Sequence, residues 1–121
     1  MKNKKCLITG VTGMVGSHLV DFLIENTSWD IQGICRWRSP LENIENHLKV
    51  INNEERLSLR YCDIRDLEAL QDIFQENVYD YIFHLAAQSY PQTSFKSPSD
   101  TYQTNIIGTN NILTCVKRFS P

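Results

Sequence analysis

Three glycines at intervals of three residues form the group whose spacing most clearly points to a binding chemistry. Gly10, Gly13 and Gly16 follow an apolar run at residues 6–8 and precede apolar residues at helical spacing. This order predicts a buried strand, a tight turn and a helix whose first N–H groups point over the turn. Such a turn lets the backbone approach a diphosphate, whose charge the N–H groups and the helix dipole stabilise. The alternative is a strand-to-helix turn that binds no ligand.

Two arginines follow the second predicted strand. In a dinucleotide site this strand ends in an acid about 20 residues after the glycines, where the acid binds the adenosine ribose. Arg36 lies at that position, Arg38 follows it, and no acidic residue is near. Because forked guanidinium donors suit a 2′-phosphate, the pattern favours NADP, with NAD as the alternative. Two solvated arginines after an edge strand would give the same pattern.

Polar and small residues after the third and fourth predicted strands are further candidates. Asp63 could accept a hydrogen bond from an adenine amino group while Ile64 covers the ring, or Asp63 could simply begin the next turn. Ala86 and Ala87 leave room for a ribose or a nicotinamide across the end of their strand. Ser89 could donate a hydrogen bond to a phosphate or a ribose.

Alternating strands and helices must position these residues. The first helix is expected to end near residues 26–27 and to bury Val15, Leu19, Phe22 and Leu23 as one stripe. Further strands are predicted at residues 30–36, 57–62 and 79–87, and further helices at 41–48, from Asp66 and from Ser97 to about 119. Right-handed crossovers then give an α/β fold with a doubly wound, Rossmann-like parallel sheet in the order 3-2-1-4. The ligand crevice of such a sheet lies between strands one and four, where the glycine turn and residues 86–89 are expected to meet.

Three single residues carry local predictions. Asp66 is expected to cap a helix that buries the apolar members of residues 67–74. Ser97, with a proline directly after it and an acid three residues later, predicts the start of the last helix. Gly108 in the middle of that helix costs roughly 1 kcal/mol relative to alanine, so a second backbone is expected to pack closely there.

Composition narrows the class of protein. The 121 residues carry a net charge of −2, and 41% of them are hydrophobic, as expected for one globular domain that does not bind nucleic acid. No apolar stretch is long enough to cross a membrane, and no signal peptide is evident. The four cysteines are expected to be reduced and buried in a cytoplasmic protein, and the scattered histidines predict no metal site. His84 is expected to be a core residue.

Together these segments resemble the extended short-chain dehydrogenase/reductase family, in particular its nucleotide-sugar epimerases, dehydratases and reductases. The matching segments are Thr-Gly-Val-Thr-Gly-Met-Val-Gly at residues 9–16, Asp-Ile at 63–64, His-Leu-Ala-Ala-Gln-Ser at 84–89 and Asn-Ile-Ile-Gly-Thr at 105–109. Ala-Ala-Gln-Ser together with the two arginines is similar to GDP-mannose 4,6-dehydratases and GDP-4-keto-6-deoxymannose reductases.

The resemblance implies a role for each candidate residue. It implies that the glycine turn binds the pyrophosphate, that the arginines bind the 2′-phosphate, that Asp63 and Ile64 hold the adenine, and that the end of the fourth strand lines the ribose and nicotinamide. The implied cofactor-binding residues are Gly10, Thr12, Gly13, Met14, Val15, Gly16, Arg36, Arg38, Asp63, Ile64, Leu85, Ala86, Ala87 and Ser89. Asn105 would tie its helix to the strands.

The chain departs from the family in one respect. The family's catalytic Tyr-x-x-x-Lys pair is absent, since none of the five tyrosines has a lysine four residues later. Residues 1–121 are therefore expected to be the N-terminal part of a dinucleotide-binding domain, truncated before the fifth strand, with the catalytic segment and the substrate domain absent. The full-length protein would be a homo-oligomeric oxidoreductase or lyase that transfers hydride at C4 of a nucleotide sugar; epimerisation, dehydration and reduction remain open. The alternative is a non-catalytic NADP-binding sensor or interaction module.

Overall fold

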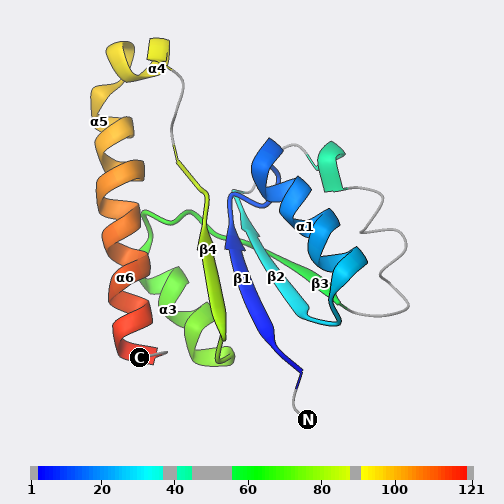
Figure 1. The fold of residues 1–121 in the computed structure, drawn as a ribbon. Helices are drawn as coiled ribbons and strands as arrows, with labels where there is room; N and C mark the ends of the chain where they lie inside the picture. Colours follow the sequence, from blue (N-terminus) through cyan, green and yellow to red (C-terminus); the bar gives the residue numbers. More distant parts are fainter. Residues whose placement is uncertain (1–2, 37–40, 45–55, 88–90, 120–121) are drawn as a thin grey trace. The chain divides into compact units, whose positions relative to one another are not determined.

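The computed structural model describes residues 3–36, 41–44, 56–87 and 91–119, and these form two compact units (Figure 1). The first unit comprises the described residues of 1–61 and 79–85. The second comprises those of 62–78 and 86–121. The predictions for Arg38 and Ser89, and most of the helix expected at 41–48, lie outside the described residues, although the 3₁₀-helix η1 (Glu42–Ile44) falls within that range.

The first unit contains a four-stranded parallel sheet. Its strands are β1 (Lys5–Thr9), β2 (Asp30–Cys35), β3 (Leu57–Tyr61) and β4 (Tyr81–His84). Their order is β3-β2-β1-β4, which confirms the Rossmann-like order predicted from the sequence (Figure 1). The register places Thr9, the last residue of β1, opposite both Ile34 and His84. The carboxyl ends of β1 and β4 are therefore neighbours.

β4 is shorter and more exposed than predicted. The expected strand covered residues 79–87, buried on both faces, but the ladder spans only Tyr81–His84 and its side chains are half-buried or exposed. Directly before β4, Asp80 bonds to Lys5 through both its backbone and its side chain. Its N–H donates to the Lys5 carbonyl, and its carboxylate accepts the Lys5 N–H. In the described sheet β4 pairs with β1 alone, so one of its edges makes no ladder bonds and its side chains keep more exposure.

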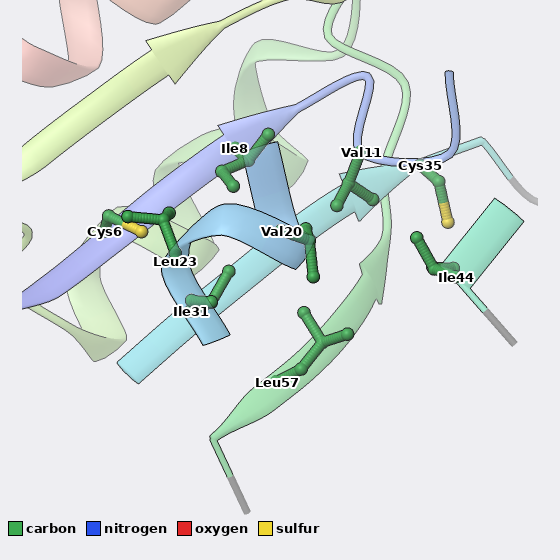
Figure 2. Close-up of a cluster of buried hydrophobic side chains, with 9 residues drawn as sticks. All are labelled: Cys6, Ile8, Val11, Val20, Leu23, Ile31, Cys35, Ile44 and Leu57. Atoms are coloured by element: carbon green, nitrogen blue, oxygen red, sulfur yellow. The ribbon is translucent and has the colours of Figure 1, made fainter. Parts of the chain in front are cut away.

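Helix α1 (Met14–Asn26) packs on one face of the sheet and forms the core of the first unit. Figure 2 shows this cluster, which joins α1, strands β1, β2 and β3, the glycine turn and η1. Its buried members are Cys6, Ile8, Val11, Val20, Leu23, Ile31, Cys35, Ile44 and Leu57. The predicted stripe was partly wrong, because Val15 and Phe22 are exposed and the buried residues are Gly16, Ser17, Val20 and Leu23. The close contact between Gly16 and the backbone of the turn at Gly10 and Val11 determines which face of α1 meets the sheet.

Arg56, which directly precedes β3, closes the carboxyl end of α1. Its guanidinium donates to the carbonyl oxygens of Leu23 (3.3 Å), Ile24 (3.1 Å), Thr27 (2.6 Å) and Trp29 (3.3 Å). The last carbonyls of a helix have no partner within it, and they carry the negative end of the helix dipole. Arg56 therefore bonds the Ile24 carbonyl in the last turn of α1, adds a donor to Leu23, whose carbonyl also accepts the Thr27 N–H, and places a favourable charge at this end.

The second unit is helical in its described part. Its elements are α3 (Leu67–Glu76), α4 (Pro91–Lys96), α5 (Pro98–Tyr102), the π-helix η3 (Gln103–Ile107) and α6 (Gly108–Phe119). Asp66 caps α3 as predicted, because its carboxylate accepts the Ala69 N–H at 3.2 Å. No helix was predicted between residues 88 and 96, and α4 has no buried residue whose spacing could have indicated one.

The last helix differs from its prediction at two points. Ser97 lies at the N-cap of α5, but its side chain makes no capping hydrogen bond. At Gly108 the close neighbour is a side chain and not a backbone: an added Cβ would lie 2.6 Å from Ile64 Cδ1. One turn further, the Asn111 amide donates to the Ile64 carbonyl at 2.9 Å. The π-helix directly precedes this contact between α6 and Ile64.

The cysteines agree with the composition-based expectation. None of the four cysteines is in a disulfide and all are buried, and burial raises the pKa of the Cys6 thiol to about 11, which makes it a poor nucleophile. Across the described part of the chain, no helix is long and apolar enough to span a membrane. The same residues contain no cluster of histidine, cysteine and carboxylate side chains suited to a metal ion.

Candidate functional site

The turn between β1 and α1 begins at a residue that must be glycine. Gly10 has a φ of 68°, in the left-handed region where other L residues are strained. Its N–H donates to the Ile34 carbonyl of β2 at 3.2 Å, and its own carbonyl accepts the Gly13 N–H at 3.1 Å. The turn is thus fixed to the end of β2 on one side and to the start of α1 on the other.

The other two glycines have different surroundings. A Cβ at Gly16 would lie 2.4 Å from the Gly10 carbonyl oxygen and 2.9 Å from Val11 Cα, both backbone atoms. A Cβ at Gly13 would meet only the Gly10 oxygen, at an ordinary 3.4 Å. Gly16 is therefore required for the packing of α1 against the turn. Gly13 is exposed, and the absence of its side chain leaves space on the outer side of the turn.

The amino end of α1 has hydrogen-bond donors available for a ligand. The N-cap is Gly13, which offers no side chain, and the first turn contains no acidic residue. Ser17 is the first residue of the helix whose N–H bonds back to the turn, to Gly13 O at 2.9 Å. The N–H groups of Met14, Val15 and Gly16 consequently have no partner within the helix. Met14 and Val15 have exposed side chains, so an anion can reach this end.

The carboxyl ends of β1 and β4 are joined next to the turn. Leu85 donates its N–H to both the carbonyl and the hydroxyl oxygen of Thr9, at 3.3 and 3.0 Å. Thr9 Oγ1 also lies 2.7 Å from His84 Nδ1. His84 is half-buried, and burial lowers the pKa of its imidazole. Leu85 itself is 38% exposed, so the predicted ligand-lining residue that follows β4 remains accessible.

Arg36 follows the last residue of β2 and is exposed. The Gly10 N–H bonds to Ile34, two residues earlier on the same strand, so this strand end and the glycine turn are neighbours. An exposed guanidinium at this place is accessible to an anion bound at the turn.

The second unit contains Asp63 and Ile64, each of which has contacts that the sequence did not indicate. The Asp63 carboxylate accepts from the Arg65 side chain at 2.6 and 3.0 Å, and Arg65 also pairs with Asp100 at 2.9 Å. These contacts raise the pKa of the Arg65 guanidinium, chiefly through its hydrogen bond to Asp63. Ile64 is only 4% exposed and lies against Gly108. Their assignment to an adenine stays a prediction.

Of the predicted residues, the structure brings together the glycine turn, including the half-buried Thr12, with Leu85 in the first unit. Ala86 is half-buried and Ala87 exposed in the second unit. Sequence reasoning missed Arg56, Arg65 and the role of Thr9. Thr9 directly precedes the first glycine, and this position was the one available signal for it. Arg56 and the Arg65–Asp100 pair act through contacts between residues distant in sequence, for which a single chain gives no pattern. The Arg65–Asp63 contact is local, between residues two positions apart.

The strand order, the left-handed glycine and the uncapped helix together define a Rossmann-like domain of the short-chain dehydrogenase/reductase class. The sequence profile of the GDP-mannose 4,6 dehydratase family matches residues 7–120. The chain belongs to this family, which confirms the resemblance drawn from the motifs. The match covers the NAD(P)-binding type of region found in nucleotide-sugar epimerases and dehydratases.

Individual relatives agree with this assignment. The chain is 38% identical to a GDP-mannose 4,6-dehydratase of Vibrio cholerae, over 97% of this chain and 32% of the relative. It is 35% identical to a dTDP-glucose 4,6-dehydratase of Escherichia coli, over 95% of this chain and 31% of the relative. Among solved structures it resembles the UDP-glucose 4-epimerase of Thermotoga maritima with UDP-glucose, with a TM-score of 0.82 and 30% identity over 96% of this chain and 35% of that one. The chain therefore spans about a third of the length of the curated relatives it matches.

Proposed function

We propose that this chain binds the diphosphate of NADP at the turn from Gly10 to Gly16. The observation that carries the proposal is the difference between the three glycines: one sets the turn, one keeps α1 close to it, and one leaves the outer side open. An uncapped helix end without acidic residues supplies the donors for the diphosphate. A turn without a ligand would still require Gly10 for its backbone conformation and Gly16 for its packing. It would not require glycine at position 13, where a side chain could be accommodated.

NADP is proposed over NAD because of the charge at the end of β2. Arg36 is exposed and occupies the place where an acid would bind the ribose hydroxyls of NAD. A guanidinium there can pair with the 2′-phosphate of NADP. NAD has no 2′-phosphate and lacks this interaction, so it is expected to bind more weakly. Arg38 is proposed as a second donor on the sequence pattern.

In the longer proteins of this family, the same region is proposed to serve reactions at C4 of a nucleotide sugar. The relatives are named for GDP-mannose, dTDP-glucose and UDP-glucose, which supports a nucleotide-linked hexose as substrate. A bound nicotinamide supplies the hydride acceptor, and Leu85, Ala86 and Ala87 are proposed to line its site. None of the tyrosines in these 121 residues has the lysine partner, so binding without turnover is expected from this chain alone.

Nuclear magnetic resonance with a ¹⁵N-labelled full chain tests the proposal. Titration with NADP should shift the amide signals of residues 10–17 and of Arg36 more than any others. Titration with nicotinamide mononucleotide, which lacks the diphosphate bridge and the adenosine, is the control and should leave the turn unchanged. Shifts that avoid the turn, or no saturable shifts with NADP, would refute the assignment.

A further inference from the structure

A glycine in β2 leaves room for a side chain of the turn between β1 and α1. Gly33 is buried inside β2, and a Cβ there would lie 2.7 and 2.9 Å from the two methyl groups of Val11. Val11 directly follows Gly10 in the turn, is fully buried and belongs to the cluster shown in Figure 2. The Val11 methyls therefore occupy the space that a side chain at position 33 would need.

This contact lies next to the hydrogen bond that joins the turn to β2. The Gly10 N–H donates to the Ile34 carbonyl at 3.2 Å, and Val11 packs against Gly33. Two consecutive residues of the turn thus meet two consecutive residues of β2, one through a hydrogen bond and one through packing. Because β2 is paired with β1 on one side and with β3 on the other, it is the fixed partner in this contact.

Val11 also meets the start of α1, through its backbone. A Cβ at Gly16 would lie 2.9 Å from the Val11 Cα, so the first turn of the helix runs close to Val11. The same helical turn carries the N–H groups of Met14 and Val15, which are proposed to donate to the diphosphate. The position of Val11 therefore sets the distance between β2 and these donors. Since Arg36 follows β2, it also sets their distance from the proposed partner of the 2′-phosphate.

Rotation of the valine side chain could not make room for a methyl group at position 33. The two Val11 methyls fill two of the three staggered positions about Cα–Cβ, and both face Gly33. Each of the other two rotamers would still place one methyl on this side. The nearby Leu59 Cδ2, at 3.0 Å, is the end of a flexible side chain and can move away. The turn itself would therefore have to shift by roughly 0.5 Å or more to reach ordinary contact at 3.4 Å, and binding groups must be held to about this precision.

We infer that Val11, packed against Gly33, is the positioning residue of the proposed diphosphate site. The contact determines where the turn lies on β2 before any ligand is present. Ligand affinity depends on the contact because it places the donors at the start of α1. The effect on affinity rests on the proposed function, whereas the placement of the turn does not. Both residues act through the turn and are not themselves ligand contacts.

Alanine variants test the contact without a ligand. Val11→Ala removes both methyls, and the matched control Val20→Ala removes the same two methyls from a fully buried position of α1 in the same cluster. Both variants should melt lower than the unmodified chain. Only Val11→Ala should speed deuterium exchange of the Gly10 amide, whose bond to Ile34 the contact supports. Equal exchange of this amide in the two variants would overturn the inference, whether or not the chain binds NADP.

Exchanging the sizes of the two residues tests the same contact from the strand. Gly33→Ala should lower the melting temperature. Val11→Ala/Gly33→Ala should melt higher than Gly33→Ala, because the new methyl occupies space that the valine has left. If Gly33→Ala does not fold, recovery of folding in the double variant is the equivalent result. A double variant that melts no higher than Gly33→Ala, or failure of both to fold, would overturn the inference.

Calorimetric titration with NADP tests the effect on binding. Val11→Ala and Gly33→Ala should each bind NADP at least about fivefold more weakly than the unmodified chain, and the double variant should bind it more tightly than Gly33→Ala. Val20→Ala should stay within about twofold of the unmodified chain. Equal affinities of Val11→Ala and Val20→Ala would overturn the inference. If the unmodified chain binds no NADP, the proposed function fails, while the exchange and melting measurements still decide whether the contact places the turn.

Discussion

Replacing Gly13 and Gly16 by alanine, one at a time, should separate binding from folding. At Gly16 the new methyl would lie 2.4 Å from one backbone atom and 2.9 Å from another, so α1 or the turn must move. Overpacking of this kind costs about 1–3 kcal/mol, and the better helix propensity of alanine returns up to about 1 kcal/mol. Since neither contact involves a flexible side chain, we expect a net loss near the upper end, about 2 kcal/mol.

At Gly13 the same methyl should leave the fold intact. The backbone there has a φ of −75°, which any residue can adopt, and the added Cβ meets one atom at 3.4 Å. The free energy of unfolding should fall by only about 0.5–1 kcal/mol, because alanine is a poorer N-cap than glycine. The methyl would, however, occupy the outer side of the turn, where the diphosphate must approach. Affinity for NADP should fall at least tenfold, or about 1.4 kcal/mol.

Thermal unfolding and calorimetric titration on the same preparations measure both effects. For a domain of this size the Gly16→Ala variant should melt about 8 °C lower. Gly13→Ala should melt no more than about 4 °C below the unmodified chain but bind NADP weakly. If Gly13→Ala binds as tightly as the unmodified chain, the turn is not the ligand site. If Gly16→Ala keeps full stability, the close approach of α1 to the turn does not constrain the fold.

Three further predictions concern a charge, a helix end and a strand edge. Arg36→Ala should weaken binding of 2′,5′-ADP by about 1–3 kcal/mol and leave 5′-AMP unchanged in calorimetry, and equal losses for both ligands would contradict the preference for NADP. Arg56→Lys should lower the free energy of unfolding by about 2 kcal/mol in urea titrations, because an ammonium group cannot bond four carbonyls at once. The control Arg118→Lys, at an exposed position of α6, should change this free energy little. The edge of β4 carries no proline or charged residue between Tyr81 and His84, so light scattering over a dilution series should show self-association, and a monomer with a concentration-independent melting temperature would refute this.

The sheet order and the glycine turn were predictable because both follow from short-range patterns. Apolar runs separated by helical segments imply parallel crossovers, and three glycines between a strand and a helix imply the turn. The buried face of α1 was not predictable in the same way. Periodicity identified Leu23 correctly, but Val15 is exposed because the contact at Gly16, which has no side chain, determines the rotation of the helix.

Contacts between residues distant in sequence account for what the sequence did not show. Arg56 follows the end of α1 by about thirty positions, and nothing in its local sequence indicates that it binds those carbonyls. Thr9 and His84 are 75 positions apart and meet because β1 and β4 are adjacent in the sheet. His84 was predicted to be a core residue, but it is only half-buried, although it does have a hydrogen-bond partner. Its partner could be identified only after the register was known.

The glycine at the N-cap of α1 has a thermodynamic consequence. A serine or aspartate at this position would stabilise the free chain through a capping bond, and the difference between such caps and glycine is typically a few tenths of a kcal/mol. The free chain forgoes that stabilisation, and the same N–H groups are left for the diphosphate. The ligand would then itself act as the cap, and it would add about 2.7 kcal/mol to the stability at a concentration of 100 times its Kd. The amount of folded protein would thus rise with the supply of cofactor, which makes proteolytic resistance of this chain a reporter of cofactor concentration.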